Sequence, residues 1–405
     1  MPAQRFAPFG TTIFTEMTLL AQMHGAVNLA QGFPDFDGPE FIIRAASEAM
    51  HSGHNQYARM FGLPALNNAI CGHWRRETGE SIDPDRQVTV TSGCTEAIAA
   101  AMLGLVDPGD EVILFEPYYD SYRASVAMAG GVPRFVTLRE PTGSARDGLA
   151  APGAFWFDPD ELRAAFTDRT RLILVNTPHN PTGKVFTRAE LELIADLCRE
   201  RNVVAVTDEV YERLTFEPDQ PHLHLATLPG MAERTLTLSS LGKTFSLTGW
   251  KIGWAIGPAA LSSAIRSAHQ FLTFATATPL QLGAAAALSD AQAADGAVLS
   301  LLQGLRERRD LLAGVLEGLG MRVYRPAGAY FVLADFTSGP HGGTFSDDQD
   351  FCRRLTAEAG VAAIPPSVFY ENRQHGRGLA RFAFCKRQET MIEAVRRLKV
   401  WAASR

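Results

Sequence analysis

Hydrophobic and polar positions alternate between two patterns along most of this chain. Short runs of aliphatic and β-branched residues predict buried strands at 87–91, 111–115, 171–176, 203–207 and 234–239. Helix-like segments lie between them at 95–105, 159–166 and 188–199, and Thr187 with Glu190 forms a predicted capping box at the start of the last one. This order of elements is typical of a mostly parallel α/β sheet with helices on both faces.

The pattern changes after about residue 299. A long charged helix is predicted there, and strands at 328–335 and 379–384 follow with a helix between them and another at the end. A chain of 405 residues also favours two lobes, because one hydrophobic core rarely grows past roughly 250–300 residues. We predict a large domain at 41–290, a small α+β domain at 291–405, and an N-terminal arm at 1–40 that forms part of the small domain.

Composition narrows the class of protein. A hydrophobic fraction of 46% and a charged fraction of 20% are ordinary for a globular enzyme, and the net charge of -6 argues against nucleic acid as the main partner. The five cysteines are scattered and never spaced as CxxC, so we expect reduced thiols and no metal site. No uncharged apolar run approaches the roughly 20 residues of a membrane span, and the first residues lack the apolar core of a signal peptide. We therefore expect a cytoplasmic protein without a membrane partner.

The segment 235–257, TLTLSSLGKTFSLTGWKIGWAIG, carries the strongest chemical signal. It places Lys243 directly after an alternating strand and inside a turn of small residues, with Ser240 and Lys251 close in the sequence. An amine beside a hydroxyl and a second cation suits an aldehyde cofactor with a phosphate, which describes pyridoxal 5'-phosphate (PLP). A P-loop would need glycine five residues before Gly242, where Thr237 stands. An ordinary surface lysine is the remaining alternative.

Three further strand ends carry candidate chemistry, and ligands of open α/β sheets bind beyond the carboxyl ends of the strands. Cys94 and Thr95 open a helix after a glycine turn, where free N–H groups suit a phosphate, although Thr95 could be a plain cap. Asn180 lies between two prolines in a run of tight turns and could be only a turn residue. Asp208 ends an apolar strand, with Tyr211 three residues later. Its carboxylate is costly there unless it meets a cation, or it caps the next helix.

These residues supply the amine, the carboxylate, the hydrogen-bond donors and the phosphate cup that PLP catalysis requires. The chain resembles the class I/II aminotransferases of fold type I, in the group of methionine, glutamine and kynurenine aminotransferases. The resemblance covers nearly the whole chain, in the motifs NLAQGFPDFDGP, NQYARMFG, NTPHNPTGKVF, TDEVYE, SSLGKTFSLTGWKIGW, VAAIPPSVF and RFAFCK. It implies a seven-stranded, mostly parallel sheet between helices, the cofactor PLP, and a homodimer with shared active sites.

The resemblance also implies roles for single residues. Lys243 would bond covalently to the cofactor aldehyde and then move the substrate proton, and Asp208 would pair with the ring nitrogen. The other cofactor contacts that it implies are Tyr211 and Asn180 at the ring oxygen, Ser240, Lys251 and the amides of Cys94 and Thr95 at the phosphate, Tyr119 on the ring face, and Tyr57 at the phosphate of the neighbouring subunit.

The substrate residues follow from the same resemblance. Arg381, which alone would most often be a surface ion-pair residue, would clamp the α-carboxylate together with Asn180 and the backbone at Gly32. Phe14, Tyr119 and Phe274 would surround the side chain, and no second arginine is evident for a distal carboxylate. Two positions depart from relatives. Lys251 stands where aspartate-type members have arginine, and Thr95 stands where animal kynurenine-type members have an aromatic residue.

We therefore predict an aminotransferase that moves an amino group from a neutral or aromatic L-amino acid, of the methionine, glutamine or phenylalanine/kynurenine type, to a 2-oxo acid by a ping-pong mechanism. A PLP-dependent carbon–sulfur β-lyase is the alternative within the fold. It shares the same site residues, and pyruvate formed without an amino acceptor would reveal it. A noncatalytic effector-binding regulator is the alternative from another class. Such regulators resemble a winged-helix domain joined to this fold, and we expect none before the NLAQGFPDF motif.

Overall fold

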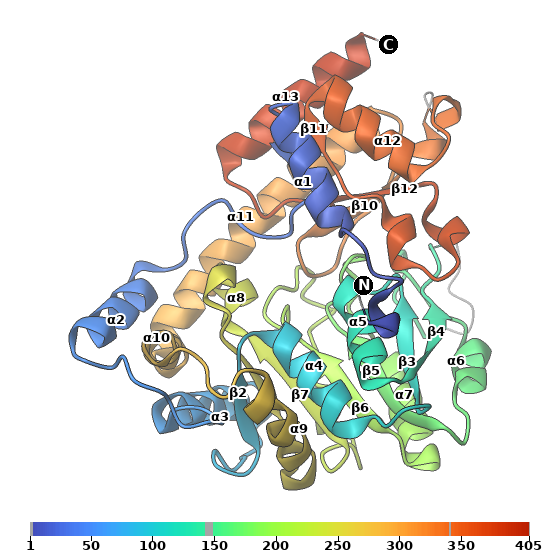
Figure 1. Ribbon diagram of the computed structural model, residues 1–405. Helices are drawn as coiled ribbons and strands as arrows, with labels where there is room; N and C mark the ends of the chain where they lie inside the picture. The colour runs from blue at the N-terminus through green and yellow to red at the C-terminus, as the bar shows by residue number, and fades with distance from the viewer. Residues whose placement is uncertain (1–2, 142–148, 340–341, 405) are drawn as a thin grey trace.

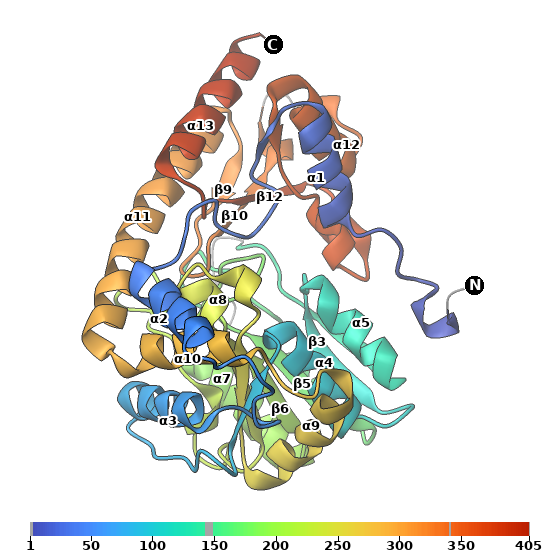
Figure 2. The same cartoon turned by 60° about the vertical axis from the view of Figure 1, so that its left-hand side comes forward.

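The computed structural model describes residues 3–141, 149–339 and 342–404. Two lobes are visible in Figure 1, a larger one below and a smaller one above, and the long helix α11 (Ala291–Gly318) runs alongside both. Helix α1 (Ile13–Met23), near the N-terminus, lies beside the C-terminal part of the chain in both Figure 1 and Figure 2.

The large lobe is built on the predicted seven-stranded sheet, in the order β2-β8-β7-β6-β5-β3-β4. Strand β8 pairs antiparallel with both of its neighbours, and the other strands share one direction. The strands are β2 (Val88–Thr91), β3 (Glu111–Glu116), β4 (Val132–Thr137), β5 (Thr170–Asn176), β6 (Val204–Asp208), β7 (Thr235–Ser240) and β8 (Gly253–Ile256). The five predicted strands are all present, within two residues at each end. Strands β4 and β8 were not located individually from the sequence.

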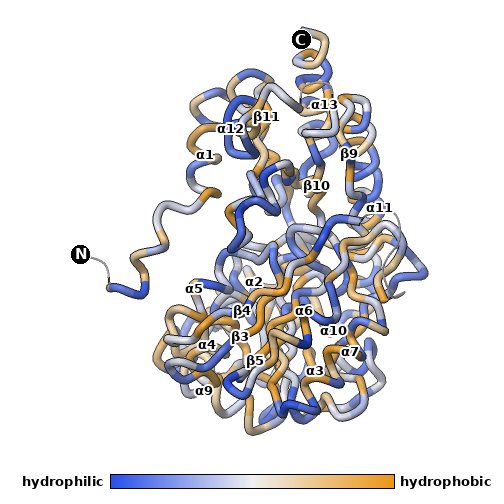
Figure 3. Tube along the Cα trace, turned by 90° about the vertical axis from the view of Figure 1, so that its right-hand side faces the viewer, coloured by the Kyte–Doolittle hydropathy of each residue, from blue (hydrophilic) through white to orange (hydrophobic). Residues whose placement is uncertain are grey.

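Helices cover both faces of this sheet because its central strands are apolar on both sides. Leu172 and Leu174 of β5 pack into one core with residues of α4, whereas Ile173 and Val175 pack into another with residues of α7. The hydrophobic colour of these strands is visible in Figure 3. The helices of the large lobe are α2 (Glu40–His51), α3 (Pro64–Thr78), α4 (Cys94–Leu105), α5 (Asp120–Ala129), α6 (Pro159–Ala165), α7 (Arg188–Arg201), α8 (Leu241–Thr244), α9 (Ala259–Leu272) and α10 (Thr278–Ser289).

The small lobe combines segments from both ends of the chain. Its antiparallel sheet has the order β12-β10-β9, and β1 pairs parallel with β11. Its strands and helices are β1 (Val27–Asn28), β9 (Arg322–Tyr324), β10 (Phe331–Asp335), β11 (Val361–Ala362), β12 (Leu379–Ala383), α1, α12 (Asp348–Arg354) and α13 (Gln388–Ala403). The pairing of β1 with β11 joins the N-terminal arm to this lobe. The boundaries at residues 40 and 290 stay predictions.

Short helical turns complete the structure. They are the 3-10 turns Gln4–Phe6, Leu225–Thr227, Thr248–Trp250, Phe336–Ser338, Gly342–Thr344, Pro366–Phe369 and Arg373–Gly376, and a π-helical turn at Leu355–Ala359. The predicted capping box is present, because Thr187 and Glu190 bond each other's backbone N–H at the start of α7. No helix in the described ranges is both long and apolar enough to cross a membrane.

Candidate active site

A cavity of about 380 Å³ lies between the two lobes, beyond the carboxyl ends of the large-lobe strands. Residues from both lobes line it, which gathers side chains that are far apart in the sequence. The predicted site residues at this cavity are Phe14, Gly32, Cys94, Thr95, Tyr119, Asn180, Asp208, Tyr211, Ser240, Lys243, Lys251 and Arg381. Tyr57 and Phe274 are the predicted residues that do not line it.

Asp208 is the last residue of β6 and is buried at the cavity wall. Its Oδ2 accepts a hydrogen bond of 2.6 Å from the Tyr122 hydroxyl, and its Oδ1 lies 3.5 Å from the Cys94 thiol. Burial raises the pKa of Asp208, and the hydrogen bond from Tyr122 opposes that rise. The Val210 backbone N–H also donates to Oδ1, at 3.4 Å. A buried carboxylate whose three donors are all uncharged is incompletely compensated, so a cationic ring nitrogen fits here.

Lys243 lies inside the short helix α8, whereas the sequence had indicated a turn. The chemistry expected of Lys243 changes little, because the helix has only four residues and carries the side chain into the cavity. Its Nζ donates to the Gly32 carbonyl oxygen at 3.4 Å, and the rings of Tyr211 and Tyr330 lie 5.8 and 5.6 Å from it. Burial lowers the pKa of this amine, which makes it a better nucleophile and base at neutral pH.

The start of α4 forms a cradle of hydrogen-bond donors. Gly93 precedes the helix with φ of 82°, and no side chain caps the free N–H groups of the first turn. A Cβ on Gly93 would lie 3.1 Å from Lys251 Nζ, so glycine is what lets this ammonium approach. Ser240 ends β7 opposite Gly253 of β8, on the same side of the cavity. A helix N-terminus, an ammonium and a hydroxyl together suit a phosphate group.

Arg381 projects from β12 and is 1% exposed. Its two terminal nitrogens donate to Asn180 Oδ1 at 3.2 Å and to the Ala30 carbonyl oxygen at 2.8 Å. The Nε atom is buried and has no hydrogen-bond partner in the described part of the chain. Burial lowers the pKa of Arg381 to about 10, which leaves the guanidinium charged at neutral pH. The rings of Phe14 and Phe331 lie 5.1 and 4.4 Å from its Cζ, so a cation stands in an apolar, aromatic setting.

Tyr57 and Phe274 lie together outside the cavity of their own chain. Their rings pack edge to face with centroids 5.5 Å apart. Tyr57 is 87% exposed and Phe274 is 46% exposed. Phe274 therefore does not line the cavity of its own chain, and its contact with the substrate side chain stays a prediction.

Sequence reasoning missed Tyr122 and Tyr330. Tyr122 lies on α5 just past Tyr119, and the spacing of three residues at a helix start could have placed both on one face. Tyr330 donates to the Gly32 carbonyl oxygen at 2.8 Å and comes just before strand β10. The place of Tyr330 at the site depends on how the two lobes pack against each other, which no local sequence pattern predicts.

The amine, the carboxylate and the phosphate cradle at this cavity fit a cofactor with an aldehyde, a basic ring nitrogen and a phosphate. Comparison with known proteins leads to a class of enzymes that uses such a cofactor. The family described as "Aminotransferase class I and II" matches residues 25–398. The chain belongs to this family of PLP-dependent aminotransferases, and its solved neighbours have the type I fold.

Three relatives illustrate the range of named activities. The chain is 46% identical to a probable N-succinyldiaminopimelate aminotransferase of Mycobacterium tuberculosis, over 99% of each chain. The solved structure of N-succinyldiaminopimelate aminotransferase from that organism superposes with a TM-score of 0.91 and covers 99% of this chain and 100% of its own. A methionine aminotransferase of Escherichia coli K12 is 39% identical over 98% of each chain. The human kynurenine–oxoglutarate transaminase 1 is 37% identical over 99% of this chain and 98% of its own. These names agree on the reaction and differ in the substrate.

Proposed function

We propose that this aminotransferase takes its amino group from neutral and aromatic L-amino acids, with methionine, glutamine and phenylalanine or kynurenine as the types that fit best. The observation that carries the proposal is the charge distribution in the cavity. Lys243, Lys251 and Arg381 are the cationic side chains among the described residues that line it. Two of them have roles at the cofactor, so one remains for a substrate carboxylate.

The cofactor residues are assigned by the chemistry of their side chains. Bound PLP supplies a ring that withdraws electrons from the substrate Cα. Asp208 would keep the ring nitrogen protonated, and Lys243 would bind the aldehyde carbon and then carry the proton to and from Cα. Tyr211 and Asn180 would donate to the ring oxygen, and Tyr119 would pack on the ring face. Ser240, Lys251 and the amides of Cys94 and Thr95 would hold the phosphate.

Arg381 would bind the substrate α-carboxylate through its planar guanidinium, with Asn180 and the Gly32 backbone beside it. The side chain of the substrate would then meet the rings of Phe14 and Tyr119. A distal carboxylate placed against this wall would lose its hydration without gaining a cation, which disfavours aspartate and glutamate. Neutral side chains carry no such cost. Thr95, smaller than an aromatic residue, leaves more room and broadens the accepted range.

N-succinyldiaminopimelate chemistry is a second candidate, and the 46% identity to the Mycobacterium tuberculosis relative favours it. A substrate of that kind carries carboxylates far from the reacting carbon. It would therefore need a cation beyond Arg381, from outside this chain's own cavity wall.

A panel of amino donors with one 2-oxo acid tests both candidates. We expect kcat/KM for methionine, glutamine and phenylalanine to exceed that for aspartate by at least about tenfold, which corresponds to roughly 1.4 kcal/mol. A clear preference for aspartate would contradict the pocket argument and leave the cofactor chemistry intact. A preference for N-succinyl-2,6-diaminopimelate over all neutral donors would establish the second candidate.

We further propose that the active unit is a homodimer in which Tyr57 reaches the phosphate of the opposite site. The exposed position of Tyr57 and Phe274, away from their own cavity, supports this. Other apolar side chains are exposed on nearby helices, namely Leu103 on α4 and Phe271 and Leu272 on α9, and they enlarge the exposed apolar surface. An apolar surface of this kind is typical of subunit contacts.

A further inference from the structure

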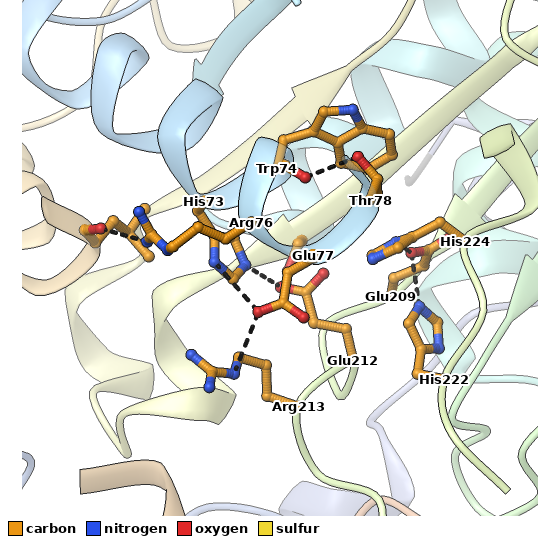
Figure 4. A network of polar contacts seen from close by, with 12 residues as sticks. His73, Trp74, Arg76, Glu77, Thr78, Glu209, Glu212, Arg213, His222 and His224 are labelled. Carbon is orange, nitrogen blue, oxygen red and sulfur yellow. Dashed lines mark hydrogen bonds and ion pairs between the residues drawn. The ribbon is translucent and has the colours of Figure 1, made fainter. Parts of the chain in front are cut away.

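A buried cluster of two imidazoles and a carboxylate lies outside the active-site cavity. Glu209 directly follows Asp208 at the end of β6, and His222 and His224 come from the segment just before the turn Leu225–Thr227. His222 Nε2 lies 2.8 Å and His224 Nδ1 lies 2.5 Å from the same oxygen, Glu209 Oε2. The side chains are 0%, 5% and 9% exposed for Glu209, His222 and His224. Figure 4 shows both imidazoles turned toward the carboxylate.

The cluster has the composition and the compactness of a metal site. One ligand atom from each side chain lies within 4.8 Å of the other two. Imidazole nitrogen and carboxylate oxygen are the donors that zinc-class ions take in proteins. The two rings are perpendicular, with centroids 4.7 Å apart, so their nitrogens approach the carboxylate from different directions.

Two buried polar atoms of this cluster remain unused. Glu209 Oε1 and His222 Nδ1 are shielded from solvent and have no hydrogen-bond partner in the described part of the chain. Buried polar atoms are nearly always paired, so each such atom in a folded protein calls for an explanation. An ion held by both oxygens of Glu209 would employ Oε1.

Further charged side chains lie near the cluster. Glu212 accepts a hydrogen bond from Ser239 at 3.0 Å and lies 3.4 Å from His73, and Glu77 follows in the same network. The guanidinium of Arg213 contacts Glu77 at 3.9 Å but also binds Asp295 at 2.6 Å. Around the proposed ligand Glu209, Figure 4 labels the carboxylates Glu77 and Glu212 and the permanent cations Arg76 and Arg213.

We propose that Glu209, His222 and His224 form a binding site for Zn²⁺ or a divalent transition-metal ion with similar ligand preferences. His222 Nε2, His224 Nδ1 and the Glu209 carboxylate, bound through one or both oxygens, supply three ligand groups, and a water would supply the fourth. Around a tetrahedral ion with ligand distances of about 2.0–2.2 Å, donors from separate side chains stand about 3.4 Å apart. The side chains would therefore separate by less than about 1 Å from their hydrogen-bonded positions. Both imidazoles ligate as neutral rings, so the proton on each ligating nitrogen leaves it, to solvent from a doubly protonated ring or to the other ring nitrogen of a neutral one.

The site would act on structure, because none of its three side chains lines the catalytic cavity. The backbone N–H of Glu209 bonds the Leu238 carbonyl oxygen at 2.8 Å, and the Trp74 ring packs on His224 with centroids 4.9 Å apart. An ion would tie the 222–224 segment to the residue next to Asp208. The proposed role is to fix the end of β6 and the helix α3 relative to each other.

The test begins with holoenzyme that has been treated with a chelator and dialysed. Equilibrium dialysis against ZnCl₂, with metal content measured by mass spectrometry, should give one ion per chain. The variant His222→Gln should weaken this binding at least about tenfold. His54→Ala removes an exposed histidine and serves as the matched control, with binding unchanged. Stoichiometric Zn²⁺ should also raise the Tm of the wild type and leave that of His222→Gln unchanged.

Two results would overturn the proposal. One is the absence of stoichiometric Zn²⁺ binding to the wild type, which would leave the cluster as a hydrogen-bonded network. The other is binding that survives in His222→Gln, because the ion would then lie elsewhere, for example at a thiol or at the cofactor. If His222→Gln does not fold, the wild type loaded with Co²⁺ decides. Visible absorption typical of nitrogen and oxygen ligands in a low-coordinate site supports the proposal, and thiolate-to-metal charge transfer contradicts it.

Discussion

Tyr122 donates a hydrogen bond of 2.6 Å to Oδ2 of Asp208, and both residues are buried at the cofactor cavity. Asp208 closes strand β6, and Tyr122 stands on α5, which follows β3. Burial raises the pKa of the Asp208 carboxyl, and this hydrogen bond works against it. The tyrosine therefore helps to keep ionised the carboxylate that we assign to the cofactor ring nitrogen.

The first prediction concerns Asp208→Ala. Removing one member of a buried ion pair costs roughly 3–5 kcal/mol. If that loss falls on the proton-abstraction step, kcat drops by roughly two to four decades. Single-turnover measurement of the donor half-reaction checks this. Asp160→Ala, at an exposed position on α6, is the control and should transaminate normally. Near-normal rates in Asp208→Ala would exclude the role assigned to the carboxylate.

The second prediction separates Tyr122 from Asp208. Tyr122→Phe keeps the ring and removes one hydrogen bond to a charged group, worth roughly 1.5–3 kcal/mol. We expect kcat to fall by roughly one to two decades. The acid limb of the pH profile of kcat should move to higher pH, because the pKa of Asp208 rises without this donor. An unshifted pH profile with a lowered rate would show that Tyr122 contributes packing alone.

The third prediction is that PLP is attached to Lys243. Borohydride reduction of the yellow holoenzyme followed by peptide mapping should place the cofactor on this residue. Lys243→Ala should keep the wild-type far-ultraviolet circular dichroism and lose turnover, whereas Lys399→Ala, at an exposed position on α13, should behave as wild type. A modified lysine at any other position would refute the assignment.

The strands of the large sheet and the helices that cover it could be predicted because the hydrophobic pattern within each segment is typical of a strand or of a helix. Residues 172–175 of β5 are apolar on both faces, and the Thr187–Glu190 capping box marks the start of α7. Strand β8 was harder to place, because it has only four residues and follows a run of turns after Lys243. The start of α11 was placed too late, since its first turns are small, mixed residues and its charged stretch begins near Arg306.

The cavity residues could be predicted where they directly follow or end a strand that the sequence predicts, as Asp208 and Lys243 do. Contacts made across the lobes could not. The bonds of Arg381 to Asn180 and Ala30 join positions 201 and 351 residues apart in the sequence. The cluster of Glu209, His222 and His224 was not predicted either. Its spacing in the sequence matches no common metal-binding motif, and the expectation of no metal site rested on the spacing of the cysteines.

The fourth prediction tests the shared site. Tyr57→Phe subunits mixed with Lys243→Ala subunits should form some dimers in which one site carries both changes and the other carries neither. That second site has wild-type residues, so activity at low PLP concentration should recover above the level of either parent. Verified subunit exchange without any recovery would count against a Tyr57 contribution across the interface.

The last prediction is a pH dependence of stability at His269. Its Nδ1 lies 2.9 Å from Glu96 Oε1, and its Nε2 lies 2.8 Å from the Met60 carbonyl oxygen. Both nitrogens face acceptors, which favours the doubly protonated ring. Burial lowers the pKa of His269, but the hydrogen bond and charge of Glu96 outweigh it, so the net shift is upward from 6.5.

A histidine with a raised pKa in the folded state contributes stability that is fully present below its unfolded pKa of about 6.5 and is lost as the pH rises through the folded value. Glu96→Gln removes the charge that raises the pKa, so it should lower Tm more at pH 6 than at alkaline pH. Glu80→Gln, at an exposed position after α3, should change Tm equally little at both. A Tm difference between Glu96→Gln and wild type that stays constant from pH 6 upward would mean that His269 is uncharged in the folded protein.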